Sequence, residues 1–349
     1  MTGRIVIALD AMGGERAPEM VVKGAAIAQQ RFPQAEFLFY GVDQRIRAHL
    51  AKLPKLAQHA IVHHTDEFIT DDVKPSVALR GGRRSSMRLA IDAVAAGEAD
   101  CVVSAGNTGA LMAMAKFALK MIPGIDRPAI ASFFPTQRGE SVMLDLGANV
   151  TCDSENLVQF ALLGDVFSRT VLGIATPSVG LLNVGAEDQK GNDAVRGAAL
   201  RLRGPGMPIH FHGFIEGDDI AEGTVDVVVT DGFTGNVALK TAEGTARLFA
   251  EFLHAAFKNS WTARFGYLFA WRSLTKLRKR MDPRRYNGAV FLGIQGICVK
   301  SHGSTDELGF ANAIGVAADM AVNGFLDKVH DEILQLAAVT APDHTTVAL

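Results

Sequence analysis

Short apolar runs alternate along the chain with longer stretches of helical periodicity. The runs are apolar at successive positions, which is typical of strands that are buried on both faces of a sheet. In the stretch 20–30, apolar residues recur at helical spacing. This alternation predicts an α/β fold, a three-layer α/β/α sandwich with a mostly parallel sheet. The expected strands are 4–9, 36–40, 101–103, 142–146, 179–184, 209–211 and 225–230.

Several of these strands end in turns that are rich in Gly, Asn, Asp and Thr. In an open parallel sheet, ligands bind beyond the carboxyl ends of the strands. We therefore expect the turns to line one crevice and to form the binding site. The five turns are 10–14, 104–109, 145–149, 183–188 and 231–236.

Composition narrows the class of protein. The chain has 349 residues, of which 48% are hydrophobic, enough to bury a large core. We expect a single α/β domain over 1–339, followed by a tail at 340–349.

The three cysteines, Cys101, Cys152 and Cys298, are far apart, which argues against both a disulfide framework and a cysteine-rich zinc site. No apolar run is long enough to span a bilayer, so we expect a cytoplasmic protein.

Charge is nearly balanced overall but not locally. A formal charge of −2 predicts no general attraction to nucleic acid, and no nucleic-acid partner is expected. The segment 261–285, however, holds both tryptophans and eight basic residues against one acid, Asp282. Residues Tyr267, Trp271, Leu274 and Met281 fall on one helical face, and Asp282-Pro283 is a stop signal. We expect a helical excursion at about 246–285 that is basic and aromatic.

The turn 106–109 precedes a strong helix former at 110–116. Free backbone N–H groups at a helix N-terminus favour a bound anion, although a glycine turn that only caps the helix is the alternative.

The sequence has no dinucleotide fingerprint, no P-loop and no nucleophile elbow. If the chain transfers an acyl group, direct transfer is therefore favoured over an acyl-enzyme. Phosphate can itself act as the nucleophile if positively charged side chains and oriented hydrogen-bond donors hold it.

Two side chains in the remaining loops are candidates for the chemistry. Lys190 is suited to position phosphate or to polarise a carbonyl, and a loop lysine paired with Glu187 or Asp188 is the alternative. His302 is suited to protonate a leaving group, and a structural histidine is equally compatible with the sequence. The histidine pairs lack carboxylate or cysteine partners, so we expect no metal.

The motifs of the chain together resemble the phosphate acyltransferases of bacterial phospholipid synthesis, which make acyl phosphate from acyl-acyl carrier protein. The resemblance spans nearly the whole chain. The matching segments are Ile7 to Pro18, Lys74-Pro75-Ser76, Ser85-Ser86-Met87, Val103 to Met112, Leu144 to Asn149, Gly180 to Gly185, Lys190-Gly191-Asn192, Asp231 to Val237, Tyr286 to Ala289 and Lys300 to Ser304.

The resemblance implies a fold like that of isocitrate and isopropylmalate dehydrogenases, a homodimer, and neither metal nor organic cofactor. Acyl carrier protein and inorganic phosphate are the implied partners. Lys190 is similar in context to the family's catalytic lysine, and we expect Asn236 and His302 to act with it. The expected substrate-binding residues are Asp10, Gly13, Gly14, Ser104, Gly106, Asn107, Thr108, Gly109, Asn149, Asp231, Thr234 and Lys300.

The resemblance also implies a peripheral membrane protein, which passes acyl phosphate to a membrane glycerol-3-phosphate acyltransferase. The basic, aromatic segment would then bind an anionic membrane, with roughly 1 kcal/mol per basic residue near the surface. A dimer helix pair and a basic dock for acidic carrier protein are the competing uses. The expected membrane contacts are Trp261, Phe265, Trp271, Arg278, Lys279 and Arg280.

Three other functions are open to the same sequence. A scaffold that binds acyl carrier or lipid would use the basic segment without catalysis. A phosphotransacetylase-like enzyme would prefer coenzyme A thioesters. A β-decarboxylating dehydrogenase is disfavoured, because no clustered aspartates for magnesium accompany the turns.

Overall fold

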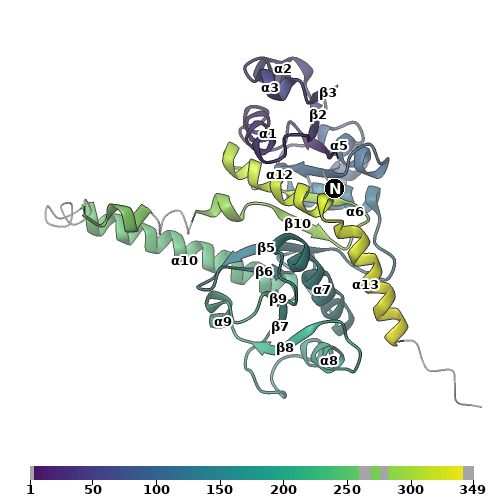
Figure 1. The fold of residues 1–349 in the computed structure, drawn as a ribbon, viewed down its shortest axis with the longest axis vertical. Coiled ribbons are helices and arrows are strands. Elements are labelled where there is room, and N and C mark those ends of the chain that lie inside the picture. Colours follow the sequence, from purple (N-terminus) through teal and green to yellow (C-terminus); the bar gives the residue numbers. More distant parts are fainter. Residues whose placement is uncertain (1–3, 259–268, 276–281, 341–349) are drawn as a thin grey trace, which may run out of the picture.

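The computed structural model describes residues 4–258, 269–275 and 282–340. One sheet of 11 strands runs through it in the order β3-β2-β1-β4-β11-β10-β5-β6-β9-β7-β8 (Figure 1). The strands are β1 (Val6–Asp10), β2 (Glu36–Gly41), β3 (Ala60–His64), β4 (Cys101–Ser104), β5 (Ala129–Pro135), β6 (Glu140–Leu144), β7 (Ser178–Leu182), β8 (His210–Ile215), β9 (Val227–Val229), β10 (Ala289–Leu292) and β11 (Ile297–Lys300).

The sheet contains two parallel blocks. Strands β3, β2, β1, β4 and β11 form the first block, and β6, β9, β7 and β8 form the second. Between them, β10 pairs antiparallel with β11 and with β5, and β5 pairs antiparallel with β6. These reversals make the second block run opposite to the first. A twist of roughly 20–25° per strand then turns the second block relative to the first.

Helices cover both faces of this sheet. One buried core lies under α1, α2, α3, α7, α8, α12 and α13. The other core lies under α4, α5, α6 and α9, with the first turns of α10 packed against it. Their bounds are α1 (Glu19–Arg31), α2 (Asp43–Leu50), α3 (Pro54–Ala57), α4 (Pro75–Gly81), α5 (Ser86–Ala95), α6 (Thr108–Leu119), α7 (Ser154–Phe167), α8 (Asp193–Leu202), α9 (Gly217–Glu222), α10 (Gly232–Lys258), α12 (Glu307–Val322) and α13 (Phe325–Thr340), with short turns η1 (Ser168–Leu172) and η2 (Pro283–Tyr286).

The successive apolar positions of each strand explain why both faces are covered. In β1, Ile7 and Leu9 enter the first core while Ala8 enters the second. Side chains of a strand point alternately to its two faces, so a strand that is apolar throughout needs a helix layer on each side. The predicted three-layer α/β/α sandwich is therefore confirmed.

Every predicted strand is present with shifted ends, and four strands were missed. β3 is an edge strand that ends in two histidines, and β10 and β11 are short. β5 has an apolar sequence, AIASFFP, that ends in proline. The predicted domain boundary at 339 stays a prediction.

The predicted excursion begins inside a much longer helix. α10 starts at Gly232, directly after β9, and projects from the middle of the molecule (Figure 1). Residues 269–275 are also helical, and η2 follows Asp282, whose side chain accepts a hydrogen bond from Arg284 N. Among the described residues, no helix is both long enough and apolar enough to cross a membrane.

Candidate active site

A buried carboxylate anchors the turns of the first block. Asp10, the last residue of β1, accepts hydrogen bonds of 2.6 Å from Ser86 Oγ at Oδ1 and from Ser104 Oγ at Oδ2. Ser104 Oγ in turn accepts a hydrogen bond from Gly106 N at 3.0 Å. Burial raises the pKa of Asp10, and these hydrogen bonds oppose that shift. Asp10 therefore lies beneath the surface and ties β1, β4 and α5 together.

Close backbone packing brings a third turn to the same place. A Cβ on Gly13 would lie 2.5 Å from Asp10 Oδ2, so only glycine fits there. Glu15 N donates to Gly303 O at 3.0 Å, and Ser301 N donates to Ser104 O at 2.8 Å. The turn after β1, the turn after β4 and the turn after β11 thus form one cluster.

This cluster borders an open hollow of about 340 Å³. It is lined by Asp71, the residues 105–109, Lys300 and Gly303. Asn107 caps α6 by accepting a hydrogen bond from Ala110 N at 2.9 Å, and its Nδ2 donates to Asp71 O at 2.7 Å. The amide of Asn107 is therefore engaged in holding the turn. The N-terminus of α6, the positive end of its dipole, faces the hollow.

Lys300 supplies a cation at the same hollow. Its Nζ donates to Ala105 O at 3.4 Å and to Ser301 O. Burial lowers the pKa of Lys300 to about 8, against the opposing effect of the Asp71 and Asp10 charges. An ammonium group beside a helix N-terminus is an anion site.

His302 lies at the surface of the adjoining turn. Its Nδ1 lies 3.0 Å from Ser304 Oγ and accepts from Ser304 N at 3.3 Å. Partial burial and the charges of Lys300 and Lys240 lower the pKa of His302, so its neutral form dominates at neutral pH. Because Lys240 belongs to α10, that helix lies within electrostatic range of the turn.

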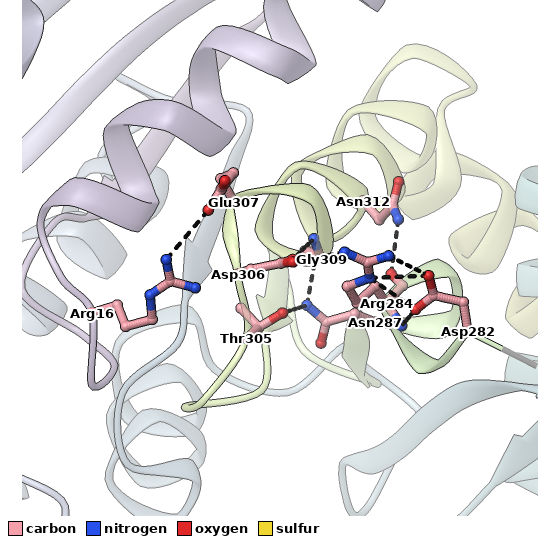
Figure 2. Close-up of polar contacts among 9 residues, drawn as sticks. All are labelled: Arg16, Asp282, Arg284, Asn287, Thr305, Asp306, Glu307, Gly309 and Asn312. Atoms are coloured by element: carbon pink, nitrogen blue, oxygen red, sulfur yellow. Dashed lines mark hydrogen bonds and ion pairs between the residues drawn. The ribbon is translucent and has the colours of Figure 1, made fainter. Parts of the chain in front are cut away.

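Asn287 holds this turn, and the sequence reading gave it no role. Its Nδ2 donates to Ser301 Oγ and to Gly309 O, both at 2.8 Å, and its Oδ1 accepts from His302 N at 2.9 Å. Figure 2 shows the surrounding polar contacts, in which the Arg284 side chain donates hydrogen bonds to the carboxylates of Asp282 and Asp306. Asn287 lay within a recognised motif, but the motif alone does not reveal which atoms it contacts.

A second buried carboxylate organises the second block. Asp145 Oδ1 accepts from the backbone N–H groups of Ile130, Gly147 and Ala148 at 2.9 to 3.1 Å. Its Oδ2 accepts from Asn149 N at 2.7 Å and from Asn149 Nδ2 at 2.9 Å. Asp145 is fully buried and was not among the predicted site residues. It fixes the turn on which Asn149 stands.

The N-terminus of α10 adds three predicted residues to this second cluster. Asp231 accepts from Thr234 N at 2.9 Å and from Thr234 Oγ1 at 2.8 Å. Asn236 Nδ2 donates to Leu146 O at 2.9 Å, and Gly232 N donates to Asn149 O at 2.7 Å. Asn149, Asp231, Thr234 and Asn236 are thus brought together.

Lys190 stands on an exposed loop after β7. Its backbone N donates to Glu187 O at 3.0 Å, and its backbone O accepts from Asn183 Nδ2 at 3.3 Å. A Cβ on Gly185 would lie 3.0 Å from Lys190 Cγ, so glycine leaves room for the lysine stem. Asp188 pairs with Arg203 at 2.8 Å, and within the described chain no carboxylate pairs with Lys190. Its ammonium is therefore available to a ligand.

Hydrogen bonds join the turns 10–14 and 104–109 in one cluster and the turns 145–149 and 231–236 in another. The two clusters belong to different parallel blocks, which the antiparallel strands β10 and β5 separate. That all five turns line one crevice stays a prediction. The membrane candidates Trp261, Phe265, Arg278, Lys279 and Arg280 lie outside the described residues, whereas Trp271 is described and exposed. In the described part of the chain, no group of three metal-ligating side chains is present.

Comparison with known proteins identifies the family. The family model described as "Fatty acid synthesis protein" matches residues 5–328. A phosphate acyltransferase of Rhodospirillum centenum is 64% identical over 353 aligned residues, covering 100% of this chain and 99% of that protein. The chain belongs to the phosphate acyltransferase family. A member from Paramagnetospirillum magneticum is 57% identical, with 96% of each chain covered. The family is one of enzymes of fatty acid and phospholipid synthesis, as the sequence motifs predicted.

Solved structures share the fold of this phosphate acyltransferase family member. A phosphotransacetylase from Streptococcus pyogenes aligns with a TM-score of 0.63 at 17% identity, covering 91% of this chain and 94% of that one. A 4-hydroxythreonine-4-phosphate dehydrogenase from Salmonella typhimurium aligns with a TM-score of 0.53 at 14% identity, covering 91% and 99%. At these identities the likeness shows the fold alone. It confirms the predicted fold class.

We predict that Asp145→Ala lowers the free energy of unfolding by about 3 kcal/mol, because it leaves buried N–H donors without an acceptor. Urea unfolding followed by circular dichroism measures this. The matched control, Asp188→Ala, removes an exposed carboxylate whose ion pair contributes about 1 kcal/mol at most. Equal stability of the Asp145 variant and the wild type would contradict the assigned role.

Proposed function

We propose that the enzyme transfers a long-chain fatty acyl group from acyl-acyl carrier protein to inorganic phosphate, giving acyl phosphate for glycerol-3-phosphate acylation. The family supplies the reaction class, an acyl transfer to phosphate. The observation that supports it most directly is the open hollow lined by Asp71, residues 105–109, Lys300 and Gly303, where the N-terminus of α6 meets Lys300. We call it the phosphate hollow. Both features favour a dianion, and neither requires a metal or an organic cofactor.

In the proposed reaction, one phosphate oxygen attacks the thioester carbon. The new C–O bond forms as the C–S bond breaks, and the sulfur leaves with the electron pair. Lys190 and Asn236 polarise the carbonyl oxygen, on which negative charge develops. His302, whose Nδ1 accepts from Ser304 N, donates a hydrogen bond from Nε2 to the departing thiolate. Thr108 and Lys300 hold phosphate, while Asp10, Gly13 and Gly14 keep the hollow in shape.

Two other functions remain as outcomes of experiment. A preference for coenzyme A thioesters would indicate a phosphotransacetylase-like donor. Binding of acylated carrier without turnover would indicate a scaffold. The exposed Lys190, with no carboxylate partner among the described residues, favours an enzyme, because a scaffold needs no free cation beside the strand ends.

The function is tested by incubating palmitoyl-acyl carrier protein with the enzyme, with and without phosphate. We expect phosphate-dependent release of carrier thiol and a product that reacts with hydroxylamine. Lys190→Ala should lower kcat about 100-fold, because one charge-stabilising group is lost. Lys116→Ala, a change on the exposed side of α6, is the control. Release that is indifferent to phosphate would overturn the proposal, and a near-normal kcat for Lys190→Ala would remove its role.

Lys300 gives the reaction a specific pH dependence. Because the pKa of Lys300 is lowered to about 8, its charge is present below that pH and is lost as the pH rises through it. The KM for phosphate should then rise by up to about tenfold per pH unit above that value. Lys300→Arg keeps its charge, since the pKa of Arg exceeds about 12, and its KM should stay flat. The same slope in both enzymes would contradict phosphate binding by Lys300.

We also propose that the enzyme is a homodimer that contacts anionic membrane at its periphery, where it delivers acyl phosphate to a membrane acyltransferase. The described helical stretch 269–275 exposes Phe269 and Trp271, which are 87% and 55% accessible. The distal part of α10 exposes Leu248, Phe249 and Phe252. Apolar side chains at an exposed tip are suited to an interface with lipid or with a second subunit.

Vesicle sedimentation separates these uses. Phe269→Ser combined with Trp271→Ser should weaken sedimentation with anionic vesicles severalfold, because the inserted apolar area is lost. The control, Phe117→Ser, removes an aromatic ring of similar exposure from α6. Unchanged sedimentation would discard the membrane contact, and a shift to monomers in analytical ultracentrifugation would assign the two side chains to the dimer.

A further inference from the structure

A second hollow, here called the basic hollow, lies between the first turn of α1 and α2. Its volume is about 490 Å³, and it is lined by Arg16, Pro18, Glu19, Arg45 and His49, together with two alanines. None of these residues belongs to the predicted or observed site. The hollow is open, and both arginine side chains reach the solvent.

The charge of this hollow is positive. Arg45 Nη2 donates to Ala17 O at 3.1 Å, a bond that leaves its charge uncompensated. Arg16 has a long ion pair of 3.7 Å with Glu307 (Figure 2). Glu19, the acid that lines the hollow, is paired with Lys23 at 2.6 Å. The first turn of α1 adds the positive end of a helix dipole.

The basic hollow adjoins the phosphate hollow. Arg16 directly follows Glu15, whose N–H donates to Gly303 O at 3.0 Å, and Gly303 lines the phosphate hollow. One backbone hydrogen bond therefore links the turn that carries Arg16 to the lining of the phosphate hollow.

We propose that the basic hollow docks the acidic surface of the acyl carrier protein and so presents the thioester to the phosphate hollow. The proposal rests on the proposed function, because that function names the carrier. Two exposed guanidinium groups on different elements, α2 and the turn before α1, suit carboxylates spread along a helix face. A small anion would need a tighter set of donors than this open hollow offers.

The test measures binding of fluorescently labelled, unacylated carrier protein by anisotropy, which needs no turnover. Arg16→Glu combined with Arg45→Glu should weaken carrier binding by about tenfold or more, and added salt should reduce the difference. Both changes lie at exposed positions, and circular dichroism checks that the variant is folded. The milder Arg45→Gln should weaken binding by a smaller factor.

The matched control is Lys116→Glu combined with Lys328→Glu, which changes the net charge equally on exposed parts of α6 and α13. It should bind carrier as the wild type does. Equal binding by the wild type and the arginine variant overturns the docking site but leaves the proposed function intact. Absence of carrier binding in the wild type itself overturns both, because the carrier is then not the donor.

Discussion

Two carboxylates taken out of water, Asp10 and Asp145, constrain everything that surrounds the site. A buried carboxylate is costly unless hydrogen bonds replace its hydration. Asp10 obtains them from Ser86 and Ser104, and Asp145 obtains them from backbone N–H groups of its own turn and of Ile130. Each need can be met only if several strand ends lie at a defined spacing. The position of each cluster of turns therefore follows from the hydrogen bonds that one buried carboxylate requires.

The sheet reverses between its two parallel blocks, and the proposed acyl transfer uses the cluster of each block differently. The first cluster presents a helix N-terminus and Lys300, which suit a phosphate dianion. The second presents Asn236, and the loop of Lys190 follows β7, which pairs with the strand β9 that precedes α10. In the proposal, both side chains act on the carbonyl oxygen. α10 starts in the second cluster, and the charge of its Lys240 lowers the pKa of His302 in the first cluster. This helix is the element that relates the two halves.

The strand pattern predicted the layers correctly, because apolar residues at successive positions require cover on both faces. It could not predict how the strands pair, since the antiparallel insertion of β10 and β5 depends on contacts far apart in sequence. The separation of the turns into two hydrogen-bonded clusters follows from that insertion. The sequence could suggest candidate residues where the residue type itself carries the chemistry, as at Lys190 and Lys300, and their roles stay predictions. Asn287 and Asp145 were missed because their importance lies in the number of bonds they make, which no local pattern reveals.

The contrast between the two lysines bears on how the site works. Lys300 is held among backbone carbonyls, so it can attract an anion before the acyl donor arrives. Lys190 is exposed, and in water its attraction for a carbonyl oxygen is weak. The same charge acts much more strongly once a bound donor excludes water from it. In the proposed reaction, phosphate can therefore be held by the free enzyme, whereas carbonyl activation requires the donor to be in place. This order would limit attack by water, because the thioester would be activated only where phosphate is already positioned to accept the acyl group.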